Sequence, residues 1–363
     1  MITDVARRER LRHNPLNEVT ATVERVTGAD GTTMVRKQLR RPTSGAAGPT
    51  PDPGAAPGAA PGAWAASTDP RHWNYWRREA EAYASAPLRA GLRAAGLDLP
   101  VASVVEFPDG ATLWLEDVAG TPGPGFDLAD HAALAAGLGR WQAQGPLEVP
   151  WASRRFLRDY SGSKPAPWHL LDDDDAWQQP LVRAAWPAGL RAGWARLVGH
   201  RDRLLDAMER LPRTHSHLDL WVANLVRRPA GTGADAGRVV LLDWAFCGDG
   251  AFGEDLGNHL PDAVFDLFWP AERLAELEEV CFPAYLAGLR EAGRRGDVDD
   301  VRLGLVASWV KYAWLLPLML AHAGDGAFRA YHEPADGEHL YRQRGLALAH
   351  LVGWCDEALR LLP

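Results

Sequence analysis

Most of the chemistry-bearing side chains of this chain stand in one short stretch. Residues 214–225 read THSHLDLWVANL and contain two histidines, an aspartate and an asparagine: His215, His217, Asp219 and Asn224. Imidazole and carboxylate groups two residues apart can share one zinc ion. The same stretch reads His-x-Asp-x-x-x-x-Asn, in which the carboxylate would orient an attacking hydroxyl and the amide oxygen would bind magnesium. The spacing allows either zinc hydrolysis or phosphoryl transfer.

A zinc site would take His215, His217 and Asp219 as its ligands. Hydrolases with a metallo-β-lactamase fold carry Thr-His-x-His-x-Asp-His, but Leu220 stands where the last histidine of that motif belongs. The half of the chain before this stretch is also no run of sandwich strands. Because short motif matches are often false positives, zinc hydrolysis is kept only as the remote alternative.

Phosphoryl transfer needs a residue that orients the hydroxyl and oxygen ligands for the magnesium ion on the phosphates. Asp219, with His217 beside it in the catalytic loop, is the candidate for the first role, and Asn224 is a candidate ligand. Asp243 follows the apolar strand 239–242, which reads VVLL. A strand, a turn and a strand between Asn224 and Asp243 would bring their oxygens together. This order of residues favours phosphoryl transfer.

An earlier lysine and glutamate would complete the nucleotide site. Lys37 lies in MVRKQL, inside an expected strand, and would bind phosphate. The later segment WRREAEAY offers Glu79 and Glu81 as its partner. Glu79 lies three residues after Trp76 and four before Tyr83, on the apolar face of the expected helix. Glu81 points away from that face, so we predict a Lys37–Glu79 pair.

A second stretch looks like a catalytic loop but fails the spacing. HRDRLLDA places His-Arg-Asp at residues 200–202, yet Ala207 stands where the asparagine belongs. This stretch lies within residues 190–211, an amphipathic segment that we expect to form one helix ending before Pro212. We interpret the motif as the solvated face of that helix.

Composition limits the class of protein. The 363 residues are 47% hydrophobic and 24% charged, which is typical of a globular protein. The net charge of −8 argues against a nucleic-acid partner. Three widely spaced cysteines, Cys247, Cys281 and Cys355, favour a reducing compartment. The first residues lack the apolar core of a signal peptide, and the apolar run 312–323 is too short to cross a bilayer. We expect a cytoplasmic protein without a membrane partner.

The N-terminal third alternates between strands and a helix. Residues 18–26 and 32–39 should pair as a hairpin across the turn GADG. Residues 42–66 repeat Pro, Gly and Ala, and we expect a disordered insertion there. Asp69 and Pro70 should begin a helix, which two strands around the turn PDG follow.

The pattern becomes mostly helical after a linker at residues 120–125, GTPGPG. We therefore predict an α+β fold with two lobes in the order of a protein kinase. The small β-rich, nucleotide-binding lobe would span residues 1–118. The larger helical lobe, residues 119–363, would carry the catalytic loop and the acceptor site.

The motifs together resemble those of the aminoglycoside phosphotransferase family, kinase-like enzymes that act on small molecules. The resemblance covers residues 19–256. HLDLWVAN is similar to the catalytic loop of that family, and LLDWAFCGDGAFGEDLG is similar to its magnesium-binding segment. WRREAEAY is similar to its helix with the lysine-pairing glutamate, and LWLEDVAG to the strand and hinge that contact adenine.

The resemblance implies roles for particular residues. Asp243 would be the magnesium aspartate, and Asp255 would brace the catalytic loop. Adenine would lie against the backbone of Glu116, Asp117 and Val118. The implied cofactors are ATP, or another nucleoside triphosphate, and Mg²⁺. The segment NPLNEVTAT, ahead of the lysine strand, contains no glycine, unlike the family's phosphate loop.

The function implied by the resemblance is that of a kinase, a phosphotransferase with an alcohol group as acceptor. The acceptors of the family include antibiotics, sugars and amino alcohols. One alternative is a kinase for Ser or Thr of a peptide natural-product precursor, with a peptide substrate. Another is a kinase-like binding protein with weak catalysis, because the phosphate loop lacks glycine.

We expect a cationic small-molecule acceptor. Residues 254–300 contain twelve carboxylates against four arginines, although such runs usually form a solvated surface. A negative surface attracts an amine and repels an anion. Helical spacing places four side chains near one face: Asp262, Phe265, Asp266 and Trp269. Of these, Asp262, Asp266 and Trp269 are the candidate acceptor contacts.

Overall fold

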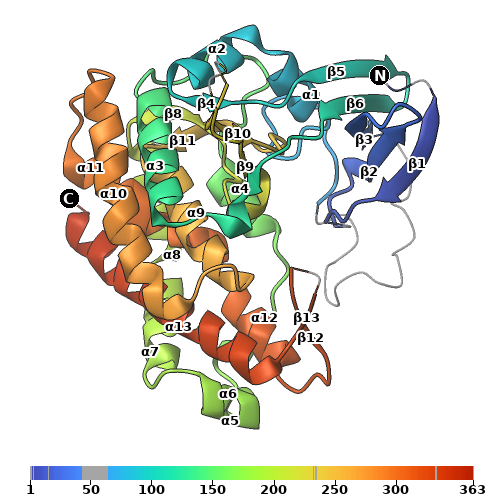
Figure 1. Cartoon of the computed structure of the whole chain (residues 1–363). Helices are drawn as coiled ribbons and strands as arrows, with labels where there is room; N and C mark the ends of the chain where they lie inside the picture. Colours follow the sequence, from blue (N-terminus) through green and yellow to red (C-terminus); the bar gives the residue numbers. More distant parts are fainter. Residues whose placement is uncertain are drawn as a thin grey trace.

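The computed structural model describes residues 2, 4–14, 16–42, 64–231, 233, 235–331 and 333–362. In this part of the chain, the larger strands gather at one end of the molecule and most helices at the other (Figure 1). The α+β class and the two-part architecture expected from the sequence are confirmed. The lobe boundary at residue 118 stays a prediction.

The strand-rich end is a five-stranded antiparallel sheet in the order β1-β2-β3-β6-β5. Its strands are β1 (Val5–Arg10), β2 (Thr20–Gly28), β3 (Thr33–Arg40), β5 (Ala102–Phe107) and β6 (Gly110–Glu116). Lys37 of β3 pairs with Val23 of β2 and with Leu113 of β6. Lys37 therefore lies on the central strand, whose backbone is held on both sides. The sequence missed β1, because all its residues after Val5 are exposed and four of these five are charged.

Two short helices connect β3 to the later strands: α1 (Arg78–Ala84) and α2 (Ala86–Ala94). The expectation that a helix begins at Asp69 and Pro70 is wrong. The Asp69 carboxylate accepts the N–H of Arg71 in a local turn, and α1 begins only at Arg78. The backbone ahead of α1 stays in turns because the buried Arg78 guanidinium binds its carbonyl groups, including that of His72.

Smaller sheets carry the loops between the two parts. A four-stranded sheet has the order β4-β10-β9-β7, and two pairs are β11-β8 and β12-β13. These strands are β4 (Leu97–Asp98), β7 (Thr121–Pro122), β8 (Arg213–Ser216), β9 (Leu225–Arg227), β10 (Val239–Leu241), β11 (Gly248–Ala251), β12 (Phe328–Ala330) and β13 (Glu333–Ala335). Leu225 of β9 pairs with Leu241 of β10, so the residues before β9 and after β10 lie at the same end of this hairpin.

The larger part is built from helices. They are α3 (Leu128–Gln142), α4 (Phe156–Ser163), α5 (Asp174–Gln178), α6 (Pro180–Ala185), α7 (Leu190–Gly199), α8 (Arg201–Arg210), α9 (Glu254–Phe265), α10 (Leu274–Glu291), α11 (Val298–Ala307), α12 (Leu315–His322) and α13 (Gly337–Leu361). Short 3₁₀ turns are η1 (Gly123–Gly125), η2 (Trp168–Leu171), η3 (Val222–Asn224), η4 (Ala271–Arg273) and η5 (Ser308–Tyr312). The single helix expected over residues 190–211 is wrong. The chain leaves helical geometry at His200 (φ −104°, ψ 0°), next to Gly199, whose helix propensity is poor.

Two hydrophobic clusters stabilise the molecule. The larger one runs through the helical part and the inner face of the five-stranded sheet. The smaller one contains Trp64, Trp73, Phe156, Tyr160, Leu218, Ala245 and Phe246. Residues 43–63 of the expected disordered insertion lie outside the described residues. The expected disorder is wrong at the C-terminal end of the insertion, because Trp64 is buried against Trp73, Tyr160 and Phe246. The large ring of Trp64 removes much apolar surface from water there.

One helical stretch, Val298–His322, is long and apolar enough by composition to cross a membrane. It consists of α11, η5 and α12. Since 89% of its most apolar window is buried inside the fold, it has the environment of a core helix.

Candidate active site

The lysine of the central strand meets two carboxylates. Lys37 Nζ lies 2.6 Å from Glu79 Oε2 and 3.0 Å from Asp243 Oδ1. These residues come from β3, from α1 and from the loop after β10. Lys37 and Glu79 are buried, whereas the Asp243 side chain is 41% exposed. Glu81, on the other face of α1, pairs with Arg77 instead.

The charges of this cluster depend on one another. Burial raises the pKa of the Glu79 carboxyl to about 7, and the Lys37 ammonium opposes that shift. Burial also disfavours a charged lysine, but the two carboxylates outweigh it and hold the pKa of Lys37 above its usual value. Tyr83, which lies on α1 with Glu79, accepts the N–H of Asp243 through its hydroxyl at 3.1 Å. Tyr83 thus connects the helix that carries Glu79 to the loop that carries Asp243.

One carboxylate, that of Asp255, holds the backbone of the loop after β8. Asp255, in the first turn of α9, accepts the N–H of His217 at 2.9 Å and that of Leu218 at 2.8 Å. Gln142 of α3 donates to the same carboxylate at 2.7 Å. Leu218 has φ 64°, a left-handed conformation that a leucine rarely adopts. The brace therefore holds the backbone just ahead of Asp219 in a costly shape.

The histidines of this stretch do not form a zinc site, which corrects the alternative reading of the motif. His217 Nε2 bonds to the carbonyl of Leu242 at 2.9 Å, and Nδ1 accepts the N–H of Asp219 at 3.3 Å. Both of its ring nitrogens are thus occupied. The His215 ring packs nearly perpendicular to the rings of Trp141 and Trp151. In the described residues, no group of three or more His, Cys, Asp or Glu side chains is arranged to hold a metal. His217 instead connects the loop with Asp219 to the residues after β10.

Asp219, Asn224 and Asp243 lie on adjoining loops. The Asn224 amide nitrogen donates to the carbonyl of Asp219 at 3.0 Å, and the Asn224 carbonyl accepts the N–H of Leu242 at 2.8 Å. The amide oxygen of Asn224 is therefore the atom left for a metal. A carboxylate and an amide oxygen form the hard donor set that Mg²⁺ prefers. The residues present fit a magnesium ion bound with phosphate.

The expected adenine contacts lie where β6 leaves the five-stranded sheet. The Glu116 carboxylate is bound by Arg228, with one distance of 2.8 Å, and the Asp117 carboxylate by Arg25 at 2.9 Å. Val118, the next residue, is half-buried. Because both carboxylates are engaged, contact with a base at this hinge would fall to the backbone.

Of the three expected acceptor contacts, Asp262 lies beside the catalytic loop. Its carboxylate accepts the Tyr312 hydroxyl at 2.7 Å and lies 3.8 Å from Lys311 Nζ. The same nitrogen lies 3.5 Å from Asp219 Oδ1. Lys311 therefore joins Asp219 to Asp262.

The other two expected contacts already have partners within the fold, and the expected ammonium site stays a prediction. Helix α9 ends at Phe265, so the helical spacing on which the expectation rested stops there. Asp266 accepts the N–H of Tyr331 and lies 3.5 Å from Arg344. Trp269 is buried, and its indole N–H donates to a carbonyl at 3.1 Å. Trp269 is thus enclosed by the protein, whereas the Asp266 carboxylate stays partly exposed.

Two lysines near the loop were missed by the sequence reading, Lys164 and Lys311. Neither belongs to a motif, so spacing carried no signal. A signal did exist in composition, because the chain has only three lysines, Lys37 being the third, among 39 basic Lys and Arg residues.

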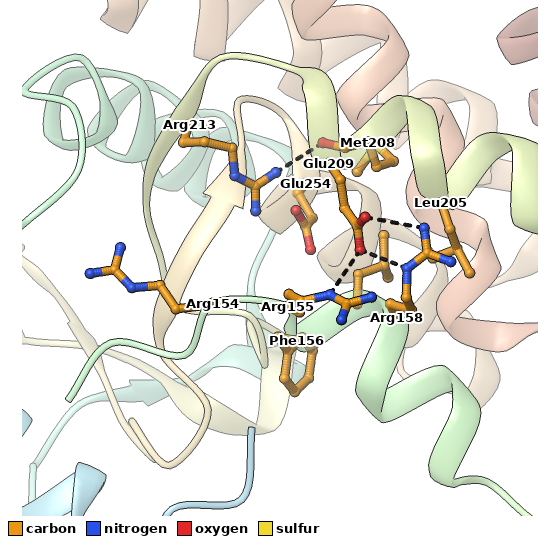
Figure 2. Close-up of a pocket in the computed structure, with 10 residues that line it drawn as sticks. Arg154, Arg155, Phe156, Arg158, Leu205, Met208, Glu209, Arg213 and Glu254 are labelled. Atoms are coloured by element: carbon orange, nitrogen blue, oxygen red, sulfur yellow. Dashed lines mark hydrogen bonds and ion pairs between the residues drawn. The ribbon is translucent and has the colours of Figure 1, made fainter. Parts of the chain in front are cut away.

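A separate surface pocket lies between the start of α4 and α8, with Arg213 of β8 and Glu254 of α9 also in its lining. Figure 2 shows the side chains of Arg155 and Arg158 converging on the carboxylate of Glu209, while Arg213 donates to the carbonyl of Met208. The basic groups there are matched by acidic or carbonyl partners. This pocket therefore lacks the unpaired charge that would mark a binding site for an ionic ligand.

Comparisons with known proteins find similarity only among solved structures. No family model and no curated protein matches the chain. The amicoumacin kinase hAmiN, solved with AMP-PNP, Ca²⁺ and Ami, is 15% identical over 98% of this chain and 89% of that chain, with a TM-score of 0.49. An aminoglycoside phosphotransferase from Alicyclobacillus acidocaldarius subsp. acidocaldarius DSM 446 is 15% identical over 99% and 94%, with a TM-score of 0.49. The choline kinase LicA from Streptococcus pneumoniae is 15% identical over 96% and 95%, with a TM-score of 0.47. Because these TM-scores lie below 0.5, the function of this chain has to be inferred from its own site.

Proposed function

We propose that this protein is an ATP-dependent phosphotransferase that moves the γ-phosphate to a hydroxyl group of a small molecule. The observation that carries the proposal is the meeting of Lys37, Glu79 and Asp243 at 2.6 and 3.0 Å. Lys37 and Asp243 are 206 positions apart in the chain, and the loop with Asp219 and Asn224 adjoins them. Phosphoryl transfer is catalysed mostly by positioning and charge, which these side chains supply.

Each residue has a role in the proposed transfer. Lys37 binds the phosphates, and Glu79 holds the lysine in place. Asp219 orients the acceptor hydroxyl and accepts its proton as the oxygen bonds to the γ-phosphorus and the bond to the ADP oxygen breaks. Asp243 and Asn224 would hold magnesium, which offsets the negative charge of the phosphates when bound.

The charge state of Asp219 suits this role. Partial burial raises the pKa of its carboxyl, and the neighbouring Lys311 opposes that rise. A carboxylate whose pKa is raised is a stronger base for the hydroxyl proton. The proposal places the enzyme in the cytoplasm. Three buried cysteines with free thiols fit the reducing conditions of that compartment.

The test combines nucleotide binding with an acceptor screen. We expect the protein to bind ATP in calorimetry only when Mg²⁺ is present, and Asp243→Ala to abolish that binding. Asp235→Ala, a matched change at an exposed aspartate, should bind ATP normally. Magnesium-dependent ATP binding that survives Asp243→Ala in a folded protein would refute the assignment.

The acceptor screen identifies the reaction. Hydroxyl-bearing small molecules are incubated with Mg²⁺ and ATP, and mass spectrometry looks for the gain of one phosphate. Peptides with Ser or Thr form a parallel arm, because a peptide acceptor is the alternative substrate class. Tight ATP binding without transfer to any acceptor would instead indicate a kinase-like binding protein.

A further inference from the structure

The chain uses lysine in an unusual way. It contains 36 arginines but only three lysines, Lys37, Lys164 and Lys311. All three lie at or beside the candidate active site. The lysine ammonium is compact, and its charge responds to its surroundings, whereas an arginine stays charged. Lys37 has its role in the proposed transfer, but the other two have none yet.

Lys311 is fully engaged by the protein. Its side chain is buried, and Nζ lies 3.5 Å from Asp219 Oδ1, 3.8 Å from Asp262 Oδ2 and 3.4 Å from the carbonyl of Leu218. Two carboxylates therefore balance its charge. The residue connects α9 to the catalytic loop.

Lys164 is held in a different way. It follows α4, and its Nζ lies over three aromatic rings, 3.9 Å from the centroid of Trp64, 4.6 Å from Tyr160 and 4.6 Å from Trp314. Within the described part of the chain, no carboxylate forms an ion pair with it. Aromatic faces attract a cation but do not neutralise it. When Lys164 is protonated, its ammonium group therefore contacts aromatic rings and no carboxylate directly.

The two ammonium groups belong to one region. Lys311 Nζ lies 5.7 Å from the centroid of the same Tyr160 ring that Lys164 contacts. Burial lowers the pKa of Lys164 to about 7, and the nearby Lys311 charge acts in the same direction. The Asp219 and Asp262 carboxylates oppose this shift but do not overcome it. A negatively charged ligand would reduce the repulsion between the two ammonium groups and would form the ion pair that Lys164 lacks.

We propose that Lys164, supported by Lys311 and the Tyr160 ring, is the acceptor-binding group of this site and that it takes an acceptor carrying an anionic oxygen group, a carboxylate or a phosphate. The inference rests on the proposed phosphotransferase function and names its substrate class. It reverses the cationic acceptor expected from the sequence. The carboxylates of Asp262 and Asp266, on which that expectation relied, already have partners in the fold.

The scarcity of lysine makes a direct test simple. Protein grown with lysine labelled with ¹³C at the ε position has three side-chain signals in a carbon–proton NMR spectrum. Lys164→Arg and Lys37→Arg identify their signals by loss, and the third signal belongs to Lys311. The three probes are sodium acetate, inorganic phosphate and tetramethylammonium chloride, each added at constant ionic strength.

We expect acetate or phosphate to move the Lys164 signal in a saturable way and to raise its titration midpoint by about 1–3 pH units, the effect of one close opposite charge. Acetate acting alone would indicate a carboxylate group on the acceptor, and phosphate alone a phosphate group. Tetramethylammonium should leave this signal in place. If tetramethylammonium displaces Lys164 from the rings, or if neither anion moves its signal, the proposal is wrong.

The same sample separates this proposal from the proposed function. Mg²⁺ and ATP should move the Lys37 signal, because that lysine would bind phosphate, while acetate should not. A Lys37 signal that ignores Mg²⁺ and ATP would overturn the phosphotransferase function, whatever Lys164 does. A Lys37 signal that responds, beside a Lys164 signal that ignores both anions, would overturn only the anionic acceptor.

Discussion

Single residues at the candidate site are held in conformations that cost free energy. Leu218 and Asp243 have φ values of 64° and 56°, which cost on the order of 1–3 kcal/mol each for residues other than glycine. The N–H of Leu218 is held by Asp255, and that of Asp243 by the Tyr83 hydroxyl. Strained residues persist where surrounding contacts over-determine them. Here they lie next to the proposed base and at the proposed metal ligand.

Asp219→Asn tests the base at the residue scale. The substitution keeps the shape of the side chain but cannot accept the hydroxyl proton. We expect transfer to fall by roughly 10²-fold or more, with unchanged folding and ATP binding, measured by initial rates and calorimetry. The control is Asp202→Asn, in the His-Arg-Asp sequence on the exposed face of α8. Equal rates for the Asp219→Asn protein and wild type would remove Asp219 from the mechanism.

His215 predicts how stability depends on pH. Burial lowers the pKa of its imidazole to about 3, and His217 adds to the shift. The unfolded chain, with a pKa near 6.5, takes up this proton first. The stabilising effect is therefore present above about pH 6.5 and is lost as the pH falls toward 3. In His215→Phe, urea unfolding should show a shallower decline below pH 6.5, by up to about 1.4 kcal/mol per pH unit. Parallel curves for the two proteins would contradict this.

At the scale of elements, one buried arginine connects three segments around α1. The Arg78 guanidinium donates to carbonyls in the turns ahead of α1, to Trp151 at 2.7 Å and to Ala245 at 3.2 Å. Ala245 lies two residues after Asp243. The helix with Glu79 and the loop with Asp243 are thus fastened to a common group. Their relative position fixes where the Lys37 ammonium lies.

Arg78→Met should therefore destabilise the fold strongly. Buried carbonyl groups that lose their only charged donor cost about 1–3 kcal/mol each, so we expect a loss of more than about 3 kcal/mol in urea unfolding. Arg77→Met is the matched control. Arg77 forms partly exposed ion pairs with Glu81 and Glu106, and such pairs contribute about 0–1 kcal/mol. If both variants lost a similar amount of unfolding free energy, the hydrogen bonds of Arg78 would not account for the stability of this region.

At the scale of the whole molecule, the smaller hydrophobic cluster joins distant parts of the chain. Trp64 and Trp73 come before the helical part, while Tyr160 and Phe246 belong to it. Leu218 of the catalytic loop packs into the same cluster. The cluster therefore fixes the position of the strand-rich end against the loop with Asp219.

Trp64→Ala tests this junction. Removing a buried tryptophan should cost about 3–5 kcal/mol in the free energy of unfolding. Replacing residues 43–63 with a shorter Gly-Ser linker while keeping Trp64 is the control. That segment has no large apolar side chain, and halving the number of residues between two fixed points changes the closure cost by only about 0.6 kcal/mol. A stable Trp64→Ala protein, or a large loss in the linker variant, would place the stabilising contacts elsewhere.

Much of the architecture and the core of the candidate site follow from the sequence alone. The hairpin around GADG, the strand that carries Lys37 and the choice of Glu79 over Glu81 depend on periodicity, which is a local property. The spacing of Asp219, Asn224 and Asp243 depends on a strand–turn–strand unit, which is local as well. Each of these features is encoded within one continuous segment of the chain, so the sequence determines it.

Other features were decided only by the tertiary structure. Helix α1 begins late because Arg78 binds carbonyls from distant segments, and Trp64 is buried because residues far along the chain cover it. The acceptor side of the site depends on Lys164 and Lys311, which are 147 positions apart and meet over one tyrosine ring. No periodicity relates such residues, since both approach the Tyr160 ring through the packing of α4 against η5. Charges brought together by packing, rather than by spacing, decided which acceptor the site can take.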